Sequence, residues 1–409
     1  MSLHHCSPIN WSQATPTPPG EPRERQRGRR RARPLAPAGG RSTRDLPPPD
    51  LAMQQQRPPS VRAVTIPFAD LEDKGKDLSG KIGGGFGRQG LGIVSIADVP
   101  GYPELRKRLL RLAPRVANLP EEVKRGLEDP NSRYNFGWSH GKQKFESGKF
   151  DTFKGSYFAN PLFDVPTTDD VLLTRFPSYC RPNIWPTGDL PELETAFKDL
   201  GKLMLEVGLM LAHHCDHYVM NQGVGQYIGE SLGQTLARSR CHKGRLLYYF
   251  PKEFSKQKDG QSISSWCGWH TDYASLTGLT CGLFMRKSVE IPCPDSGAGL
   301  HIRSRDNQVV KVTFENDELA YMTGETAEIL SRGHLRATPH CVKAPSSEDA
   351  SLVDRSTFAL FVQPNWDEKI KFPSGFPYHQ ELSIPPNETL AYGEYSERLL
   401  NKHYEEART

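Results

Sequence analysis

Three residues in the C-terminal half of the chain have the types and the spacing of a mononuclear metal site. His270 and Asp272 lie in the segment WHTDYASLTGL, and His340 lies in LRATPHCV. Two histidines and one carboxylate can occupy one face of an octahedral iron(II) ion and leave the opposite face open for substrate chemistry. Residues i and i+2 of a strand point to the same side, so His270 and Asp272 can reach one ion from one strand. His340 must then come from a distant strand that the folded sheet brings alongside.

A cation and a hydroxyl follow these ligands on a further predicted strand. Arg355 and Thr357 share one face of the run RSTFALFV. A guanidinium holds a carboxylate through two parallel hydrogen bonds, and a neighbouring hydroxyl can add a third. Iron oxygenases that use a keto dicarboxylate need such a clamp at the end of the co-substrate that faces away from the metal. The order HxD, His, Arg-x-Thr is therefore much more specific than the metal triplet, which a chain with 13 His also produces by chance.

Short β-like runs, broken by Gly, Pro, Asn and Asp, fill the chain from residue 245 onward and must position these residues. The runs are RLLYYFP, SWCGWHTD, SLTGLTCGLFM, GLHIRS, QVVKVTF, ELAYMTG, LRATPHCV and RSTFALFVQP. About eight strands at such intervals predict a double-sheet antiparallel barrel. The segment TAEILSRG predicts a short helix that ends at Gly333, and residues 393–406 predict a C-terminal helix.

The N-terminal half is predicted to be more helical. YPELRKRLLRLAPRV is amphipathic and is expected to stop near Pro114. A long helix is predicted across LPELETAFKDLGKLMLEVGLMLAHHCDHYV, because Leu200, Met204, Val207 and Leu211 recur at helical spacing.

Two further motifs resemble ligand sites without meeting the requirements of those sites. KIGGGFGRQGLGIVSI contains a GxGxxG spacing, but the β-like run follows the glycines, whereas a dinucleotide site needs it before them. We predict a flexible turn that feeds a strand. In HHCDH, His213 and His217 have the i, i+4 spacing of helical zinc sites, yet the glutamate of such motifs is missing, because position 214 is His. Core or helix-end histidines are the favoured interpretation there, and His301 and His334 are assigned no role beyond lining a pocket.

The β-like segments resemble the isopenicillin N synthase-like branch of the 2-oxoglutarate and iron(II)-dependent oxygenases. The matching pieces are RLLYYFP, WHTDYASLTGL, ELAYMTGETAEILSRGHLRATPHCV and RSTFALFVQP, and the resemblance extends over residues 90–395. NLPEEVKRGL and the stretch from NPLFDVP to NIWP look like the family's helical cap. The resemblance implies a mainly β fold with α-helices, in which a double-stranded β-helix (jelly-roll, cupin-like) barrel carries a helical N-terminal cap.

The resemblance also assigns roles to single residues. The positions that match the iron ligands are His270, Asp272 and His340. Arg355 matches the anchor of the co-substrate carboxylate, and Thr357 stands where the family usually has Ser. Tyr249 matches the tyrosine of an Asn-x-Tyr strand that often touches the co-substrate, whereas Leu247 replaces the asparagine of that motif.

Each of these residues also has a purely structural interpretation. His270 and Asp272 would then form a buried hydrogen-bonded pair, and His340 would be a partly buried strand histidine. Arg355 would form a surface ion pair with Asp354 or Glu348, a common and weak interaction. Thr357 and Tyr249 would be ordinary packing residues of a strand.

The activity implied by the resemblance is a 2-oxoglutarate- and Fe(II)-dependent dioxygenase that hydroxylates a small-molecule metabolite with O2 and releases succinate and CO2, with ascorbate in support. One alternative in the same family is an Fe(II) oxidase that does not use 2-oxoglutarate, in which Arg355 binds a substrate carboxylate; Leu247 keeps this alternative open. A non-catalytic binding protein on the same fold is an alternative from another class. We expect a monomer that binds neither nucleic acid nor membranes.

Composition and the resemblance together divide the chain into four parts. Residues 1–60 hold ten Arg, no Lys and four acids, a net charge of 10 − 4 = +6, and are predicted to be a disordered Arg/Pro-rich extension. Residues 61–240 are expected to be a mixed α/β cap region, 241–375 the Fe(II)/2-oxoglutarate dioxygenase jelly-roll core, and 376–409 a C-terminal helical tail. Since the whole chain carries +4, the remainder carries −2, which does not favour nucleic acid or membranes as partners.

The same composition bears on the compartment. The eight Cys are scattered without CxxC pairs, which suits reduced thiols, and no apolar run reaches the ~20 residues of a membrane span. We therefore expect a cytoplasmic protein. Alternatively, the Arg-rich segment is a transit peptide for a plastid or mitochondrion, or a basic patch for nuclear import or nucleic acid.

Overall fold

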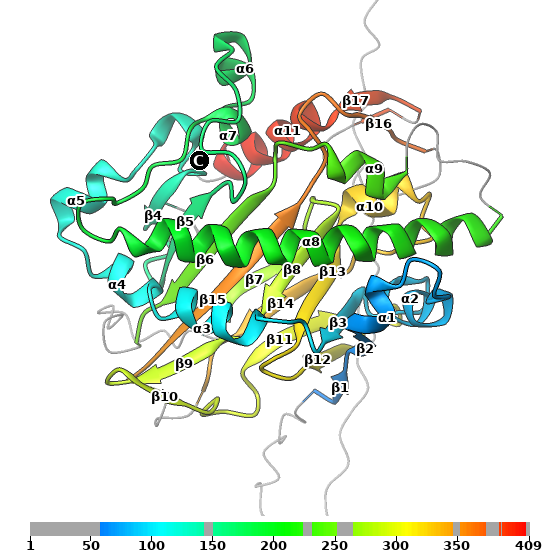
Figure 1. Ribbon diagram of the computed structural model, residues 1–409, viewed down its shortest axis with the longest axis horizontal. Coiled ribbons are helices and arrows are strands. Elements are labelled where there is room, and N and C mark those ends of the chain that lie inside the picture. The colour runs from blue at the N-terminus through cyan, green and yellow to red at the C-terminus, as the bar shows by residue number, and fades with distance from the viewer. Residues whose placement is uncertain are drawn as a thin grey trace, which may run out of the picture. The chain divides into compact units, whose positions relative to one another are not determined.

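Two large β-sheets and a set of helices make up the described part of the chain (Figure 1). The computed structural model describes residues 58–142, 150–223, 231–251, 265–346, 352–373, 384–385 and 387–405. Residues 56–409 form one compact unit. The prediction of a mainly β protein with α-helices is confirmed. The predicted extension at residues 1–60 lies outside the described residues, apart from its last three positions.

The smaller of the two sheets carries two of the predicted metal ligands. Among the described residues it has five strands, in the order β1-β12-β11-β14-β7. Their bounds are Ser60–Arg62 (β1), Val309–Thr313 (β12), Gly299–Arg303 (β11), His340–Lys343 (β14) and Ser265–His270 (β7). All pairings are antiparallel except the parallel pair of β1 and β12.

The larger sheet carries Arg355, Thr357 and Tyr249. Its main path, over the residues that the structure describes, runs β2-β3-β13-β8-β15-β6-β5-β4, and β9 and β10 branch from β15. The bounds are Val64–Pro67 (β2), Ile93–Ala97 (β3), Leu319–Thr323 (β13), Leu276–Thr280 (β8), Val353–Val362 (β15), Lys243–Tyr249 (β6), Lys154–Ala159 (β5), Gly137–His140 (β4), Leu283–Arg286 (β9) and Val289–Ile291 (β10). Every β-like run of the sequence contains a strand, and SLTGLTCGLFM contains two, β8 and β9.

The helices in the described ranges are mostly short. Their bounds are Phe68–Glu72 (α1), Ser79–Phe86 (α2), Tyr102–Leu110 (α3), Ala113–Ala117 (α4), Glu121–Gly126 (α5), Asp170–Arg175 (α6), Pro177–Cys180 (α7), Glu192–Asn221 (α8), Leu232–Ala237 (α9), Glu325–Leu330 (α10) and Tyr392–Glu405 (α11), with a 3-10 turn at Pro130–Ser132. The predicted short helix before Gly333 is α10, and the predicted C-terminal helix is α11. None of these helices is both long and apolar enough to span a membrane.

The long helix α8 lies across one face of the larger sheet and is the predicted amphipathic helix (Figure 1). The four residues that define its apolar stripe, Leu200, Met204, Val207 and Leu211, are all fully buried. They belong to the main hydrophobic core between α8 and the sheet, which also contains Tyr321 and Leu360. This packing supports the sheet from the face opposite the pocket described below.

The predicted flexible turn at the GxGxxG segment is wrong, because its first glycines form the helix α2. A Cβ atom at Gly85 would lie 2.2 Å from Cγ1 of Val94, so only a glycine lets this helix pack so closely on β3. The strand β3 follows the helix, as the sequence predicted, and this order is the reverse of a dinucleotide-binding unit.

A second difference concerns Pro114, which does not end a helix. The helix α3 ends at Leu110, and Pro114 stands in the first turn of α4, where its missing N–H costs nothing.

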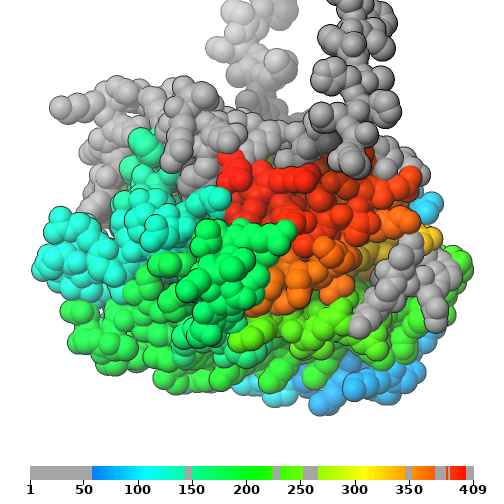
Figure 2. All heavy atoms as spheres, turned by 90° about the horizontal axis from the view of Figure 1, so that it is seen from above, coloured from blue at the N-terminus to red at the C-terminus, as the bar shows by residue number. Residues whose placement is uncertain are grey.

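A smaller core joins the C-terminal elements to the N-terminal half. The short strands β16 (Lys369–Lys371) and β17 (Thr389–Ala391) pair with each other. Side chains from these strands, from α7 and from α11 form one buried cluster that includes Tyr179, Ile370 and Tyr395. Figure 2 shows α11, in red, on the surface beside the green segments that follow α5 in the sequence.

Candidate active site

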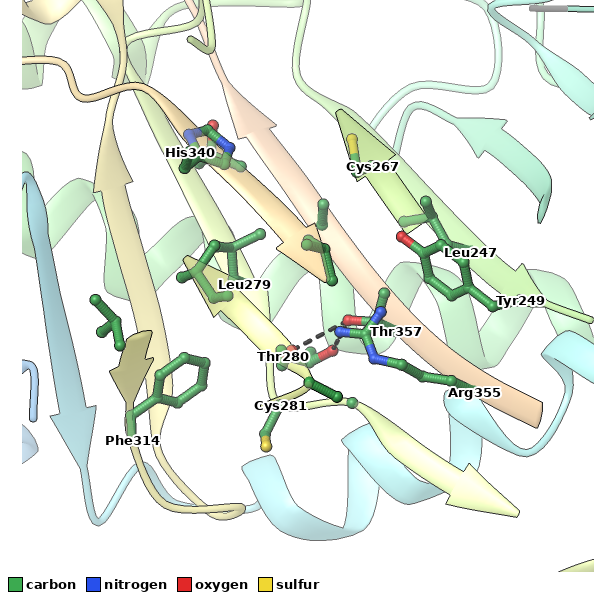
Figure 3. A pocket seen from close by; sticks show the side chains of 18 of the residues that line it. Leu247, Tyr249, Cys267, Leu279, Thr280, Cys281, Phe314, His340, Arg355 and Thr357 are labelled. Carbon is green, nitrogen blue, oxygen red and sulfur yellow. Dashed lines mark hydrogen bonds between the residues drawn. The ribbon is translucent and has the colours of Figure 1, made fainter. Parts of the chain in front are cut away.

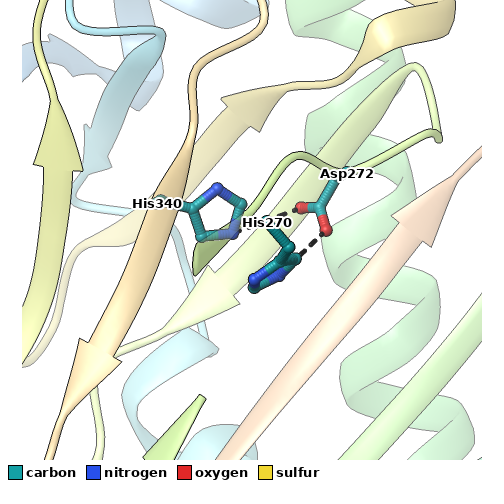
Figure 4. A group of neighbouring side chains, drawn as sticks. All are labelled: His270, Asp272 and His340. Atoms are coloured by element: carbon teal, nitrogen blue, oxygen red, sulfur yellow. Dashed lines mark ion pairs between the residues drawn. The ribbon is translucent and has the colours of Figure 1, made fainter. Parts of the chain in front are cut away.

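The two histidines and the aspartate predicted as metal ligands come together in the folded chain (Figure 4). One ligand atom from each of His270, Asp272 and His340 lies within 4.8 Å of the other two. Nε2 of His270 is 3.6 Å from Oδ1 of Asp272, and Nε2 of His340 is 3.9 Å from Oδ2 of the same carboxylate. In the described ranges this is the one group of three or more such side chains with metal-binding geometry.

Neighbouring strands of the smaller sheet bring the histidines together. His340 on β14 pairs directly with His270 on β7, and their ring centroids are 4.3 Å apart. The prediction that a distant strand must deliver His340 is therefore confirmed. The register shifts between this pair and the next one, Val342 with Cys267. This bulge lets Cys267 and His270 both face the pocket although they are three positions apart.

Asp272 is not on the strand, in contrast to the prediction that one strand carries both His270 and Asp272. The strand β7 ends at His270, and Asp272 lies in the loop that follows. The start of α10 holds this loop, because the backbone N–H of Glu325 donates to the Asp272 carbonyl at 2.8 Å. The Thr326 hydroxyl donates to the Tyr273 carbonyl at 2.6 Å. The carboxylate thus keeps its direction through helix α10 rather than through strand alternation.

Both histidines present the same ring nitrogen to the metal position. Nδ1 of His270 lies 2.9 Å from the Gly268 carbonyl, and Nδ1 of His340 lies 3.1 Å from the Thr338 carbonyl. A carbonyl accepts only from a protonated nitrogen, so each Nδ1 carries a hydrogen and each Nε2 is the nitrogen that faces the metal position.

The protonation of the two rings differs. Desolvation and the charge of His270 lower the pKa of His340, which is therefore neutral and ready to bind a metal. Desolvation acts to lower the pKa of His270, but the Cys267 thiolate and the Asp272 carboxylate outweigh it, and the pKa lies above its ordinary value. A metal that binds here must displace a proton from His270.

Arg355 lies in the same cavity as a buried cation with unused donors. Its side chain is buried, and among the described residues Nε and Nη1 have no hydrogen-bond partner. The guanidinium carbon lies 5.0 Å from the ring centre of Tyr249 and 5.3 Å from that of Trp266. In the described part of the chain no ion pair joins Arg355 to Asp354, whose carboxylate accepts from the Tyr248 hydroxyl at 3.1 Å. The other alternative partner, Glu348, lies outside the described residues.

Thr357 shares a strand face with Arg355, as strand alternation predicted. The Thr357 hydroxyl donates to the Thr280 carbonyl at 3.1 Å (Figure 3). On β6, Tyr249 pairs with Arg355 and Leu247 pairs with Thr357. Tyr249 therefore packs its ring on the guanidinium, and an apolar Leu247 stands beside the threonine.

A cavity of about 270 Å³ connects the metal position with the arginine, and both sheets line it. The six predicted site residues all contribute to its wall: His270, Asp272, His340, Arg355, Thr357 and Tyr249. Figure 3 shows His340 and Arg355 toward opposite ends of the side chains drawn. Neither His301 nor His334 is among the lining residues.

Gly282 and Arg245 are among the residues of this wall that the sequence analysis did not identify. A Cβ atom at Gly282 would lie 2.4 Å from Nε of Arg355, so the glycine makes room for the guanidinium. Arg106 of α3 fixes this turn from behind, because its Nη2 donates to the Cys281 carbonyl at 2.8 Å. Arg245 lines the cavity two positions before Leu247. Strand alternation alone would have identified Arg245, whereas nothing in the sequence pointed to Gly282.

In the HHCDH segment, no three ligating side chains of the described residues converge on one point. Nε2 of His214 donates to the Leu71 carbonyl at 2.9 Å. The carboxylate of Asp216 accepts from the backbone N–H groups of Leu232 and Gly233 at the start of α9. The rings of His213 and His217 on α8 are in contact, with centroids 4.3 Å apart and an angle of 54° between their planes. The favoured interpretation of core and helix-end histidines agrees with these contacts.

The residues present fit both iron(II) and a dicarboxylate. Two imidazole nitrogens and one carboxylate that converge from one side form the donor set of non-haem iron sites with open positions. The unpartnered Nε and Nη1 of Arg355 need an acceptor, because a buried cation without one is costly. A carboxylate supplies two acceptor oxygens in the geometry of the guanidinium.

The chain matches no protein-family model and no curated protein, but it is similar in structure to solved oxygenases. A full-length Neurospora crassa protein, crystallised with alpha-KG and thymine, is 20% identical, with a TM-score of 0.60 over 84% of this chain and 97% of that one. JOX2, crystallised with 2OG, Fe and JA, is 16% identical, with a TM-score of 0.55 over 83% of this chain and 85% of that one. The dioxygenase for auxin oxidation (DAO) in rice is 16% identical, with a TM-score of 0.52 over 83% of this chain and 95% of that one.

These similarities define the class of fold. The chain has the fold of the 2-oxoglutarate- and iron(II)-dependent oxygenases, and the neighbours match it over most of their length. At such identities the likeness concerns the fold alone. The chemistry has to be argued from the side chains of the cavity.

Proposed function

We propose that this protein is a 2-oxoglutarate- and Fe(II)-dependent dioxygenase that oxidises, by hydroxylation, a small-molecule metabolite. The main support is one observation: a buried arginine with unpartnered Nε and Nη1 lies in the same cavity as a His-Asp-His group. The metal group alone fits several chemistries. Together with a clamp for a distant carboxylate, it fits a keto dicarboxylate that reaches from Arg355 to the metal. The neighbours crystallised with alpha-KG or 2OG support the same proposal.

The residues of the cavity have separate tasks in this proposal. Bound iron(II) and 2-oxoglutarate supply the O2 chemistry, in which the co-substrate is oxidised to succinate and CO2 and one C–H bond of the substrate gains an oxygen atom. His270, Asp272 and His340 hold the metal and leave one side of it free. Arg355 binds the distal carboxylate, and Tyr249 keeps the guanidinium in place through its ring face. Apolar side chains such as Leu247 and Leu279 keep water away from the reacting atoms.

The test is binding and turnover with the full chain. Under anaerobic conditions the wild-type protein with iron(II) and 2-oxoglutarate should show a metal-to-ligand absorption band. In air, with ascorbate, it should form succinate slowly without added substrate. A His270→Ala variant should lose both signals. Wild-type protein that binds neither iron(II) nor 2-oxoglutarate would contradict the proposal.

A family oxidase that does not use 2-oxoglutarate is the second candidate, and Leu247 favours it. This leucine stands opposite Thr357, in place of the family's asparagine, and offers the keto acid no hydrogen bond. In that case Arg355 holds a carboxylate of the substrate itself. Iron(II) binding without any 2-oxoglutarate binding would favour this candidate. A non-catalytic binding protein would bind its ligand without forming succinate.

The finer features of the prediction belong to the same proposal. We propose that the strands of the two sheets that lie within 241–375 form a double-stranded β-helix, with 61–240 as a cap region that adds β2 to β5 to the larger sheet, 376–409 as the helical tail and 1–60 as an extension. O2, a small-molecule substrate, ascorbate support, a monomeric state and a cytoplasmic location complete the proposal. Sequencing of the N-terminus of the native protein tests whether a transit peptide is removed instead.

A further inference from the structure

The segment that directly precedes His340 is irregular but buried. Residues 336–339 belong to no helix or strand, yet Ala337 and Thr338 are both shielded from solvent. The carbonyl of Thr338 accepts the Nδ1 hydrogen of His340 over 3.1 Å. The backbone of this segment therefore decides which way the His340 ring points.

A buried carboxylate of helix α10 binds this segment. Glu328 is only 1% exposed, and its Oε2 accepts from the backbone N–H of Ala337 at 2.8 Å. Its Oε1 forms an ion pair with Nε of Arg336 at 2.6 Å. Burial of a carboxylate is costly unless hydrogen bonds or a cation compensate it. Here the segment before His340 supplies both, so the carboxylate and the segment hold each other in place.

An arginine from another element binds the same segment. Arg305, in the turn between β11 and β12, donates from Nη1 to the Ala337 carbonyl at 2.9 Å and from Nη2 to the Thr338 hydroxyl at 2.8 Å. Its Nη2 also donates to the Arg336 carbonyl at 3.1 Å. Because Nε donates to the Gly90 carbonyl at 3.2 Å, the guanidinium has a fixed direction. Side chains of two different elements thus hold the N–H and the carbonyl of Ala337.

Helix α10 also holds the loop that carries the carboxylate ligand. The backbone N–H of Glu325, in the first turn of this helix, donates to the Asp272 carbonyl at 2.8 Å. Glu328 stands three residues further along the same helix. One helix therefore connects Asp272 to the segment that orients His340. A metal site keeps its geometry only when the groups that support its ligands are themselves fixed.

We infer that Glu328 is a positioning residue of the metal site, which sets the direction of the His340 ring relative to Asp272. The inference rests on the proposed function, because it assigns a metal to these ligands. Glu328 is not among the residues that line the cavity, so its effect passes through the Ala337 N–H and the Thr338 carbonyl to Nδ1 of His340. A residue that only stabilised the fold would leave the direction of the ring unchanged.

The experiment uses the full chain with cobalt(II) as a paramagnetic probe, so that no turnover is needed. In the wild type, the Nδ1 protons of His270 and His340 should give two exchangeable NMR signals that the metal shifts strongly. The His340 proton should exchange more slowly with water, because its side chain is 7% exposed and that of His270 is 40% exposed. Glu328→Leu should move the slowly exchanging signal and leave the other in place. Cobalt(II) affinity should fall about tenfold or more, as expected when a group that orients a ligand is lost.

Two further variants separate positioning from stability. Glu328→Gln keeps an oxygen that can accept from the Ala337 N–H, and it should restore most of the cobalt(II) affinity and the position of the slowly exchanging signal. Asp216→Leu is the matched control, because Asp216 is also a buried carboxylate that accepts backbone N–H groups, but it lies on α8. This variant should lower the melting temperature and leave both signals and the cobalt(II) affinity unchanged.

Arg305→Met provides a second test, which does not depend on how well Glu328→Leu folds. It loosens the same segment from the other element and should move the same NMR signal. Thermal melting shows which variants are folded. Folded Glu328→Leu and Arg305→Met variants with the signals and the cobalt(II) affinity of the wild type overturn the inference alone, as does an equal change in Asp216→Leu. A wild type that binds no cobalt(II) contradicts the proposed function and the inference with it.

Discussion

The metal end and the arginine end of the cavity differ in how the protein itself satisfies their polar atoms. At the metal end, each histidine has its Nδ1 hydrogen bonded to the carbonyl two residues earlier, Gly268 or Thr338. At the arginine end, Nε and Nη1 of Arg355 have no acceptor in the part of the chain that the structure describes, and the guanidinium lies against aromatic rings. The first site is arranged before its ligand arrives. The second is left incomplete until an anion completes it.

Because of this difference, the binding of the metal and the binding of the anion should be related to the stability of the ligand-free protein in different ways. Replacement of a metal-ligating side chain removes one preorganised donor of the metal and should leave the fold intact. Replacement of Arg355 removes an unpaired buried charge, so affinity for the anion and stability of the free protein should change in opposite directions. Each of the following variants tests either the metal end or the arginine end of the cavity.

The largest effect is expected from loss of a metal ligand. Asp272→Ala removes the one anionic donor, so iron(II) affinity should fall by more than the roughly 10- to 100-fold that loss of an outer hydrogen-bond partner causes. Iron content after anaerobic loading measures this effect. Asp199→Ala, at an exposed ion pair with Arg108, is the matched control and should bind iron like the wild type. A fully loaded Asp272→Ala protein would contradict the assignment.

Arg355→Met should separate affinity from stability. The affinity for 2-oxoglutarate should fall on the order of 100-fold, because two charge-assisted hydrogen bonds are lost. The melting temperature of the ligand-free protein should stay equal or rise, since methionine fills the space without a buried charge. Calorimetry and melting curves measure the two quantities. A clear drop in melting temperature would show that the aromatic rings satisfy the arginine by themselves.

The metal end should respond to pH. Because Cys267 and Asp272 hold the pKa of His270 above its ordinary value, iron(II) must displace a proton from this ring. Apparent iron affinity should therefore rise about tenfold per pH unit between pH 6 and 8, with one proton released per metal. Cys267→Ala removes one cause of the raised pKa and should flatten this slope. A slope of zero in the wild type would mean that His270 is already neutral.

Gly282→Ala tests the space around the guanidinium. The added Cβ would lie 2.4 Å from Nε of Arg355, so the arginine must move. The KM for 2-oxoglutarate should rise about tenfold, with little change in iron affinity. Gly188→Ala, where a Cβ meets no atom within 4 Å, is the matched control. Equal KM values for both variants would show that the clamp tolerates the displacement.

The smallest effect is expected at Thr357. Thr357→Val removes the hydroxyl that donates to the Thr280 carbonyl and should lower the free energy of unfolding by about 1 kcal/mol. Thr357→Ser keeps the hydroxyl and should restore the hydrogen bond. Urea denaturation of both variants measures the difference. Equal stability of the valine and serine variants would show that this hydrogen bond contributes nothing.

Many helices and strands could be predicted because the spacing of apolar residues along the sequence shows which side chains are buried. The apolar stripe of α8 and the β-like runs after residue 245 became a helix and strands as expected. The glycine segment was misread, because the helix α2 depends on close packing between Gly85 and Val94, a contact that no local pattern contains. The position of Asp272 was also misread, since the end of β7 depends on how helix α10 ties the following loop.

The sequence by itself determined which chemical groups are available: two histidines, one aspartate, and an arginine with a threonine two positions later. Side-chain types and strand alternation are local properties, so these could be recognised without a fold. Only the tertiary structure decided that β14 lies beside β7, that Arg355 is buried without an acceptor, and that Arg245 shares its cavity. Pairing register and burial depend on residues far apart in the chain, and the ligand chemistry follows from them.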